Sequence, residues 1–132
     1  MDTPTQARTI LVVDDDPDFL LQTKLQLEVA GYLVLSANSL KEADQVLAES
    51  KPDLVVADLM MEFMDAGLVL CHHVKKKNAK TPVILVSAVQ SETGMAFEPS
   101  LSTSGRGWIK ADAMLTKPVR AEQLKREIDR LL

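Results

Sequence analysis

Short apolar runs alternate along this chain with longer segments whose apolar residues recur at helical spacing. The clearest runs, residues 10–13 and 54–57, are continuous and rich in Val, Ile and Leu, which is typical of strands buried on both faces. In the segment between them the recurring apolar positions are Leu40, Ala43, Val46 and Leu47. Strands that alternate with helices predict an α/β fold, in which a parallel sheet is covered by helices on both faces.

Turn and capping residues set the expected boundaries. Asp16 and Pro17 predict the start of the first helix, because a capping carboxylate often precedes a proline at the first helical position. Gly31 predicts its end, and Asn38 or Ser39 could cap the second helix. The expected strands are residues 10–13, 32–35, 54–57, 82–86 and 113–115, and the other helices are expected at residues 67–78 and from Ala121 onward.

Residues 88–110 resist assignment. They are rich in Ser, Thr and Gly; residues 91–97 could be helical, whereas residues 98–107 resemble a loop. A connection of this length within a compact domain is expected to be functional or mobile.

Composition restricts the remaining function classes. A chain of 132 residues with 46% hydrophobic content suits one domain with an ordinary core, and its net charge of −4 disfavours direct nucleic-acid binding. Cys71 is the single cysteine, so no internal disulfide can form, and we expect it to be buried. No apolar stretch is long enough for a membrane span and no signal peptide is evident, so a cytoplasmic protein is expected.

Residues 75–77 are three lysines, interpreted as a solvated helix face. His72 and His73 point in different directions on a helix and predict no metal site.

Polar side chains follow four of the expected strands. Asp14, Asp15 and Asp16 follow the first, Asp58 the third, Ser87 the fourth and Lys117 the fifth. Any one of these alone is most often a turn or capping residue, and Asp16 is expected to be such a cap. Together they are expected to converge, because ligand crevices of parallel sheets form at the carboxyl ends of the strands.

Converging carboxylates repel each other unless a cation lies between them. Mg²⁺ prefers oxygen ligands and often shares a substrate phosphate. A lysine supplies a point charge for phosphate, and a serine hydroxyl can donate a hydrogen bond to it. The set therefore predicts phosphoryl transfer with Asp58 as the nucleophile, since a carboxylate can form an aspartyl-phosphate.

Four stretches of the chain resemble the response-regulator receiver domains of two-component signalling. They are residues 10–17 (ILVVDDDP), 52–61 (PDLVVADLMM), 81–88 (TPVILVSA) and 115–119 (LTKPV). The resemblance covers nearly the whole chain and implies a tail at residues 1–8 and a receiver domain at residues 9–132. It also implies a doubly wound, flavodoxin-like sheet of five parallel strands with five helices.

The resemblance assigns a role to each site residue. Asp58 would be phosphorylated, with Ser87 and Lys117 contacting the phosphoryl group. Asp15 and Asp58 would ligate Mg²⁺, together with the backbone carbonyl of Met60, and Asp14 would act through water.

This chain departs from the family pattern at three places. Glu62, Phe63 and Ala66 stand where relatives usually have a proline and then a glycine, and Gly67 comes one residue late. Ser87 and Lys117 are also further apart than in most relatives, and the excess lies in residues 88–110. Met114 occupies the position at which many relatives carry an aromatic switch residue.

The implied function is a signalling switch, without enzymatic activity beyond self-phosphorylation from a phosphodonor and autodephosphorylation. Its implied partners are a histidine kinase or phosphotransfer protein and an unknown downstream target, with no direct nucleic acid and no membrane. The chain could form a homodimer on phosphorylation, and it could stand alone or belong to a longer protein.

Two other functions remain open. One is a Mg²⁺-dependent phosphohydrolase, because residues 14–16 resemble the opening motif of haloacid dehalogenase-like phosphatases, with Asp14 as nucleophile. Those enzymes also need a late acidic pair, and Asp112 stands alone there. The other is a scaffolding module that keeps the fold without the chemistry.

Overall fold

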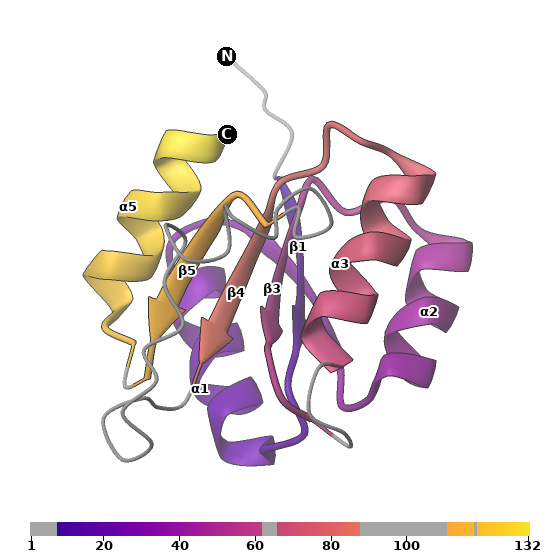
Figure 1. Cartoon of the computed structure of the whole chain (residues 1–132). Helices are drawn as coiled ribbons and strands as arrows, with labels where there is room; N and C mark the ends of the chain where they lie inside the picture. Colours follow the sequence, from indigo (N-terminus) through magenta and orange to yellow (C-terminus); the bar gives the residue numbers. More distant parts are fainter. Residues whose placement is uncertain (1–7, 62–65, 88–110, 118) are drawn as a thin grey trace.

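A computed structural model describes residues 8–61, 66–87, 111–117 and 119–132 of the chain. Within them, five strands form one sheet in the order β2-β1-β3-β4-β5, and every pair of neighbouring strands is parallel (Figure 1). This order confirms the predicted doubly wound sheet, because the chain moves first to one edge and then to the other. The strands are β1 (Thr9–Val13), β2 (Leu33–Ala37), β3 (Leu54–Asp58), β4 (Val83–Ser87) and β5 (Ala113–Thr116).

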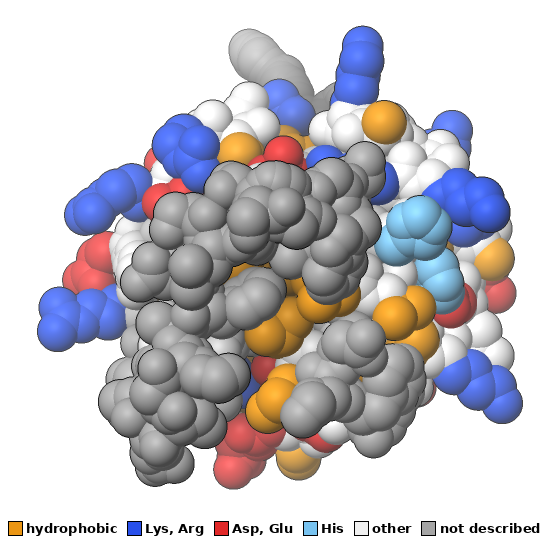
Figure 2. All heavy atoms as spheres, viewed as in Figure 1, with side chains coloured by type: hydrophobic (Ala, Val, Ile, Leu, Met, Phe, Trp, Pro, Cys, Tyr) orange, Lys and Arg blue, Asp and Glu red, His pale blue; other side chains and the backbone are white. Residues whose placement is uncertain are grey.

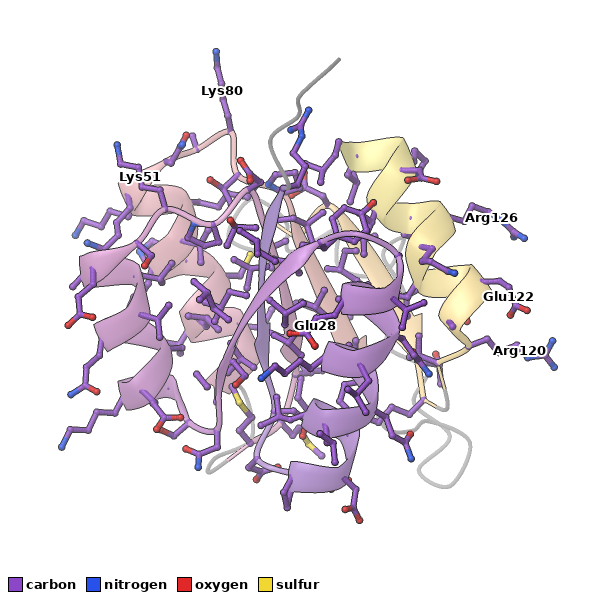
Figure 3. The ribbon with its side chains drawn as sticks, turned by 180° about the vertical axis from the view of Figure 1, so that it is seen from behind. Glu28, Lys51, Lys80, Arg120, Glu122 and Arg126 are labelled. Carbon is purple, nitrogen blue, oxygen red and sulfur yellow. The ribbon has the colours of Figure 1, made fainter. Side chains whose placement is uncertain are left out.

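The described residues form four helices, two on each face of the sheet (Figures 1 and 3). Helices α2 (Leu40–Glu49) and α3 (Ala66–Lys77) cover one face, and α1 (Pro17–Val29) and α5 (Ala121–Leu131) cover the other. The resemblance implies a fifth helix, which would fall in residues 88–110, outside the described part of the chain. None of the helices that are described is long and apolar enough to cross a membrane.

The strands supply the core of both layers. Leu11 and Val13 of β1 pack in the cluster under α2 and α3, whereas Ile10 and Val12 pack in the cluster under α1 and α5. Successive residues of a strand point to opposite faces, so an uninterrupted apolar run is what a sheet covered twice requires. Cys71 lies in the α2–α3 layer and is buried, as predicted.

The predicted boundaries of α1 and α2 agree with their caps. The Asp16 side chain accepts a hydrogen bond from the Asp18 N–H, and Gly31 has a φ of 103°, a left-handed conformation that glycine adopts without strain. Ser39, not Asn38, caps α2: its hydroxyl accepts from the Glu42 N–H, while the Glu42 carboxylate accepts from the Asn38 N–H.

Strand β2 is displaced from its predicted position. It begins at Leu33 rather than Tyr32 and continues through Ser36 to Ala37. Its pairing with β1 runs from Thr9 opposite Leu33 to Val13 opposite Ala37. The neighbouring strand therefore sets its length, since neither serine nor alanine favours a strand by itself.

The interpretation of residues 75–77 as a solvated helix face is wrong for Lys75. Its ammonium group lies 2.7 Å from Asp112 Oδ2 and 2.7 Å from the Thr81 carbonyl oxygen. Asp112 Oδ2 also accepts a hydrogen bond from the Val83 N–H at 2.8 Å. Lys75 thus joins α3 to the starts of β4 and β5, whereas Lys76 is exposed as predicted.

Candidate functional site

Backbone hydrogen bonds bring the ends of the strands together at one edge of the sheet. The Leu59 N–H, directly after β3, donates to the Val86 carbonyl oxygen at 2.8 Å. The Lys117 N–H, directly after β5, donates to the Ser87 carbonyl oxygen, also at 2.8 Å. The Asp14 N–H, directly after β1, donates to the last residue of β2 at 3.1 Å. These bonds anchor the backbone of the site residues to the sheet.

Three carboxylates lie together at this edge. Asp14, Asp15 and Asp58 each offer an oxygen within 4.8 Å of the others, and they are the only such group of potential metal ligands among the described residues. Asp14 is fully buried, Asp58 is 6% exposed and Asp15 faces solvent. Figure 2 shows acidic side chains at the lower edge of the molecule, where the carboxyl ends of the strands lie in Figure 1, and the histidines well away from it.

Lys117 lies between two of the carboxylates. Its ammonium nitrogen is 2.8 Å from Asp14 Oδ2 and 3.5 Å from Asp58 Oδ2. Burial alone would lower the pKa of Lys117, but the hydrogen bond to Asp14 and the charges of Asp14 and Asp58 raise it. Lys117 therefore remains a cation inside the cluster.

The Asp58 carboxylate is destabilised in its ionised form even though Lys117 lies beside it. Burial and the negative charge of Asp14 raise the pKa of Asp58 to about 6, against the lowering effects of Lys117 and of the Met60 N–H, which donates to Asp58 Oδ1 at 3.3 Å. Asp14 has a second partner, the Asp16 N–H at 2.9 Å. Asp58 is thus the carboxylate that gains most from an additional cation.

This donor set fits a hard divalent cation. Carboxylate oxygens are the ligands that Mg²⁺ takes in proteins, usually with water and a substrate phosphate completing its coordination. Two buried acids and one solvent-facing acid leave the cluster open on one side. The cluster is therefore compatible with Mg²⁺.

Two residues near the site were not predicted from the sequence. Gly67, in the first turn of α3, packs so closely that a Cβ atom there would overlap the Asp58 carbonyl oxygen and lie 2.7 Å from the Leu59 Cα. A glycine inside a predicted helix is the signal that could have indicated this approach. The Phe19 ring lies 4.4 Å from the Lys117 ammonium nitrogen.

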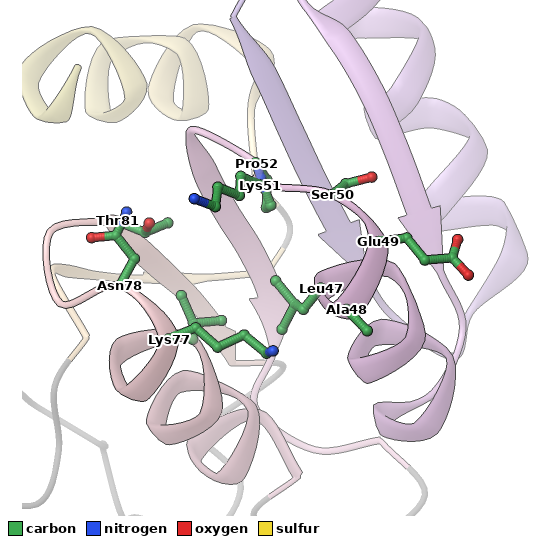
Figure 4. Close-up of a pocket in the computed structure, with 10 residues that line it drawn as sticks. Leu47, Ala48, Glu49, Ser50, Lys51, Pro52, Lys77, Asn78 and Thr81 are labelled. Atoms are coloured by element: carbon green, nitrogen blue, oxygen red, sulfur yellow. The ribbon is translucent and has the colours of Figure 1, made fainter.

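A separate pocket lies at the opposite end of the sheet (Figure 4). Its volume is about 410 Å³, and it is lined by the C-terminal ends of α2 and α3 and the loops that precede β3 and β4. It contains none of the site residues, because the connections before the strands lie at the edge opposite to Asp58.

Comparison with known proteins decides the family. Residues 10–129 match the protein family described as the response regulator receiver domain. The chain belongs to this family. Receiver domains are signalling modules, and this result disfavours the phosphohydrolase alternative.

Several relatives of the receiver domain are similar along nearly its whole length. The transcriptional regulatory protein GlrR of Escherichia coli is 36% identical over 120 residues, and the alkaline phosphatase synthesis transcriptional regulatory protein PhoP of Bacillus subtilis is 28% identical over 125 residues. These alignments cover 91% and 95% of this chain, but only 25% of GlrR and 48% of PhoP. The chain therefore spans about a quarter to a half of these relatives.

Solved structures share the fold. The chemotaxis response regulator CheY4 of Vibrio cholerae superposes with a TM-score of 0.80 at 23% identity, over 96% of this chain and 100% of that one. A CheY-like receiver domain protein of Methanospirillum hungatei gives a TM-score of 0.79 at 28% identity, over 96% and 94% of the two chains.

Proposed function

We propose that this receiver domain, residues 9–132, is phosphorylated on Asp58. The observation that carries the proposal is the position of Asp58 at the end of a central strand, grouped with the carboxylates of Asp14 and Asp15 and 3.5 Å from the Lys117 ammonium nitrogen. Burial and the charge of Asp14 also raise the pKa of Asp58, so the ionised form of this carboxylate is a stronger base than an ordinary one. Asp14 is paired with Lys117 and the Asp16 N–H, which leaves Asp58 the less satisfied of the two buried acids.

The transfer balances with one bond formed and one broken. An oxygen of the Asp58 carboxylate attacks the phosphorus of the donor, and the bond from phosphorus to the donor's leaving atom breaks with its electron pair. Acetyl phosphate releases acetate, whereas a phosphohistidine releases an imidazole whose nitrogen takes a proton from solvent, and in both cases an acyl phosphate remains on Asp58. Lys117 is 3.5 Å from Asp58 and would contact the new phosphoryl group as a cation. Ser87, at the end of β4, would donate its hydroxyl to a phosphoryl oxygen.

Asp14, Asp15 and Asp58, together with the backbone carbonyl oxygen of Met60, would hold Mg²⁺. When bound, the metal would neutralise charge on the phosphoryl oxygens. The close grouping of the three carboxylates supports this assignment, and the Met60 carbonyl is included because the family resemblance implies it.

The phosphodonor would be a histidine kinase or a phosphotransfer protein, and a separate protein would read the phosphorylated state. An apolar stripe on α1, which begins beside the site and runs away from it along the helix, could receive the donor: Leu21, Leu25 and Val29 recur every fourth residue and are all exposed, Val29 at 88%. Helical residues at this spacing share a face. Figure 3 views the molecule from the side on which α1 lies in front.

Two relatives indicate what kind of protein could contain this domain. GlrR and PhoP are described as transcriptional regulatory proteins, so a longer protein containing this domain could act on transcription through another part. The net charge of −4 argues against direct nucleic-acid contact by this chain. A cytoplasmic location and dimerisation on phosphorylation remain predictions.

Intact-mass measurement tests the proposal. The parent protein, incubated with acetyl phosphate and Mg²⁺, is expected to gain the mass of one phosphoryl group, and to gain none when the metal is chelated. The Asp58→Asn variant is expected to gain none, whereas Asp53→Asn, which changes an aspartate at the opposite end of β3, is expected to behave as the parent. Phosphorylation of Asp58→Asn at the parent's rate would refute the assignment.

A further inference from the structure

The Lys117 ammonium group faces an aromatic ring as well as two carboxylates. Its nitrogen lies over the ring of Phe19, 4.4 Å from the ring centroid. This is inside the distance of about 6 Å over which the negative face of a ring attracts a cation. Phe19 is the third residue of α1, whose start is set by the Asp16 cap and by Pro17. The ring is therefore carried by a rigid element beside the site.

Water competes little for this lysine. Its side chain is 21% exposed, and its nearest charged atoms are Asp14 Oδ2 at 2.8 Å and Asp58 Oδ2 at 3.5 Å. The attraction between a ring and a cation is stronger where water is excluded. The Phe19 ring therefore attracts an ammonium group that is already largely shielded from water by its contacts with Asp14 and Asp58.

We propose that Phe19 is a positioning residue that holds the Lys117 ammonium group within reach of the phosphoryl group on Asp58; this proposal rests on the proposed function. The ammonium group lies 2.8 Å from Asp14 Oδ2 and 3.5 Å from Asp58 Oδ2, so a contact with Asp58 or its phosphoryl group as short as the one with Asp14 would need a small shift of the ammonium group. Hydrogen bonds weaken steeply when their geometry changes. The attraction of a ring face has no single acceptor atom, so it persists while the ammonium group moves across the ring.

Packing alone would explain Phe19 differently. The ring is partly buried and packs against the apolar layer beneath α1 and α5. An aliphatic side chain of similar size can fill that position, but it cannot attract a cation. The two explanations therefore differ in how the site responds to the charge of the ring at constant volume.

A series of phenylalanines with one, two and three fluorines at position 19 separates them. Fluorine withdraws electrons from the ring face and changes the volume little. The rate of phosphorylation by acetyl phosphate is expected to fall stepwise, by about threefold to tenfold at the third fluorine, while each variant keeps a cooperative unfolding transition. Phe19→Trp is expected to keep the parent rate, because the indole ring also attracts a cation. Phe19→Leu is expected to be phosphorylated as slowly as the trifluorinated protein or more slowly, because leucine has no ring. In a Lys117→Met background, fluorination is expected to have no effect on the residual rate.

The contact itself can be measured without phosphorylation. The ring current of Phe19 should shift the Lys117 Hε protons upfield in the metal-free protein, and Phe19→Leu should remove that shift. Equal shifts in the parent and Phe19→Leu, or a rate independent of fluorination, would overturn the role of Phe19 alone. A parent protein that takes up no phosphoryl group would overturn the proposed function and this role with it.

Discussion

Replacing Asp58 with asparagine is expected to stabilise the protein, and the gain should depend on pH. In the folded protein the pKa of Asp58 is raised from 3.8 to about 6, mainly by burial and by Asp14. A group whose folded pKa is raised favours folding only while it is protonated. Its contribution is therefore fully present below its unfolded pKa and is lost as the pH rises through the folded pKa. At neutral pH the ionised Asp58 therefore lowers the free energy of unfolding, which means that it destabilises the folded protein.

The size of the gain follows from the two pKa values. At 1.36 kcal/mol per pKa unit, the difference between 3.8 and about 6 corresponds to ~3 kcal/mol once Asp58 is ionised in both states. Asparagine resembles the protonated carboxyl group, so Asp58→Asn should gain ~3 kcal/mol at pH 7 to 8 and ~1 kcal/mol near pH 4.5. Asp58 itself is 6% exposed, but the adjoining Asp15 faces solvent, which screens the charges of the cluster, so ~3 kcal/mol is an upper value for the gain.

Urea unfolding of the metal-free proteins at a series of pH values measures this difference. Asp18→Asn is the matched control, since it makes the same chemical change on an exposed aspartate near the site, and it should alter stability by less than ~0.5 kcal/mol at every pH. An Asp58→Asn variant that gains nothing at pH 7, or gains equally at pH 4.5 and pH 7, would show that the ionised Asp58 carboxylate does not destabilise the folded protein.

Four further predictions follow from the geometry. Mg²⁺ should raise the unfolding midpoint of the parent more at pH 8 than at pH 5, since a larger fraction of Asp58 is ionised, and should leave Asp58→Asn nearly unchanged, as calorimetry can show. Lys117→Met should destabilise the metal-free protein by ~2–3 kcal/mol in urea unfolding, because it leaves the buried Asp14 without its counter-charge. Gly67→Ala should lower the free energy of unfolding by ~1–3 kcal/mol despite the better helix propensity of alanine. The new Cβ would overlap backbone atoms at the end of β3, which cannot rotate away as a side chain could. Lys75→Ala should cost ~1–2 kcal/mol, whereas Lys76→Ala, one position along the same helix but exposed, should cost less than ~0.5 kcal/mol in the same assay.

The sequence predicted the parts of the fold that carry their own local signal. Strands β1, β3 and β4 are buried on both faces, so each reads as an unbroken apolar run that no surface element would show. Strand β2 is an outermost strand of the sheet and is partly exposed. Its pattern is weaker, and its extent became clear only from its register with β1.

The acidic cluster and its lysine were predictable for a similar reason. Asp14, Asp58 and Lys117 each end or follow a strand, and the order of elements alone places those ends at one edge. The contact of Lys117 with Phe19 depends on how α1 lies beside the end of β5, which the sequence pattern does not encode. The pairing of Lys75 with Asp112, 37 residues away, was missed for the same reason.

Phosphorylation of Asp58 is tested most directly by locating the phosphoryl group. After treatment with acetyl phosphate and Mg²⁺, borohydride reduction converts an aspartyl-phosphate to homoserine, and peptide mass spectrometry identifies its position. We expect homoserine at position 58 in the parent and at no position in Asp58→Asn. Homoserine at position 14, or a parent protein that carries none, would contradict this expectation.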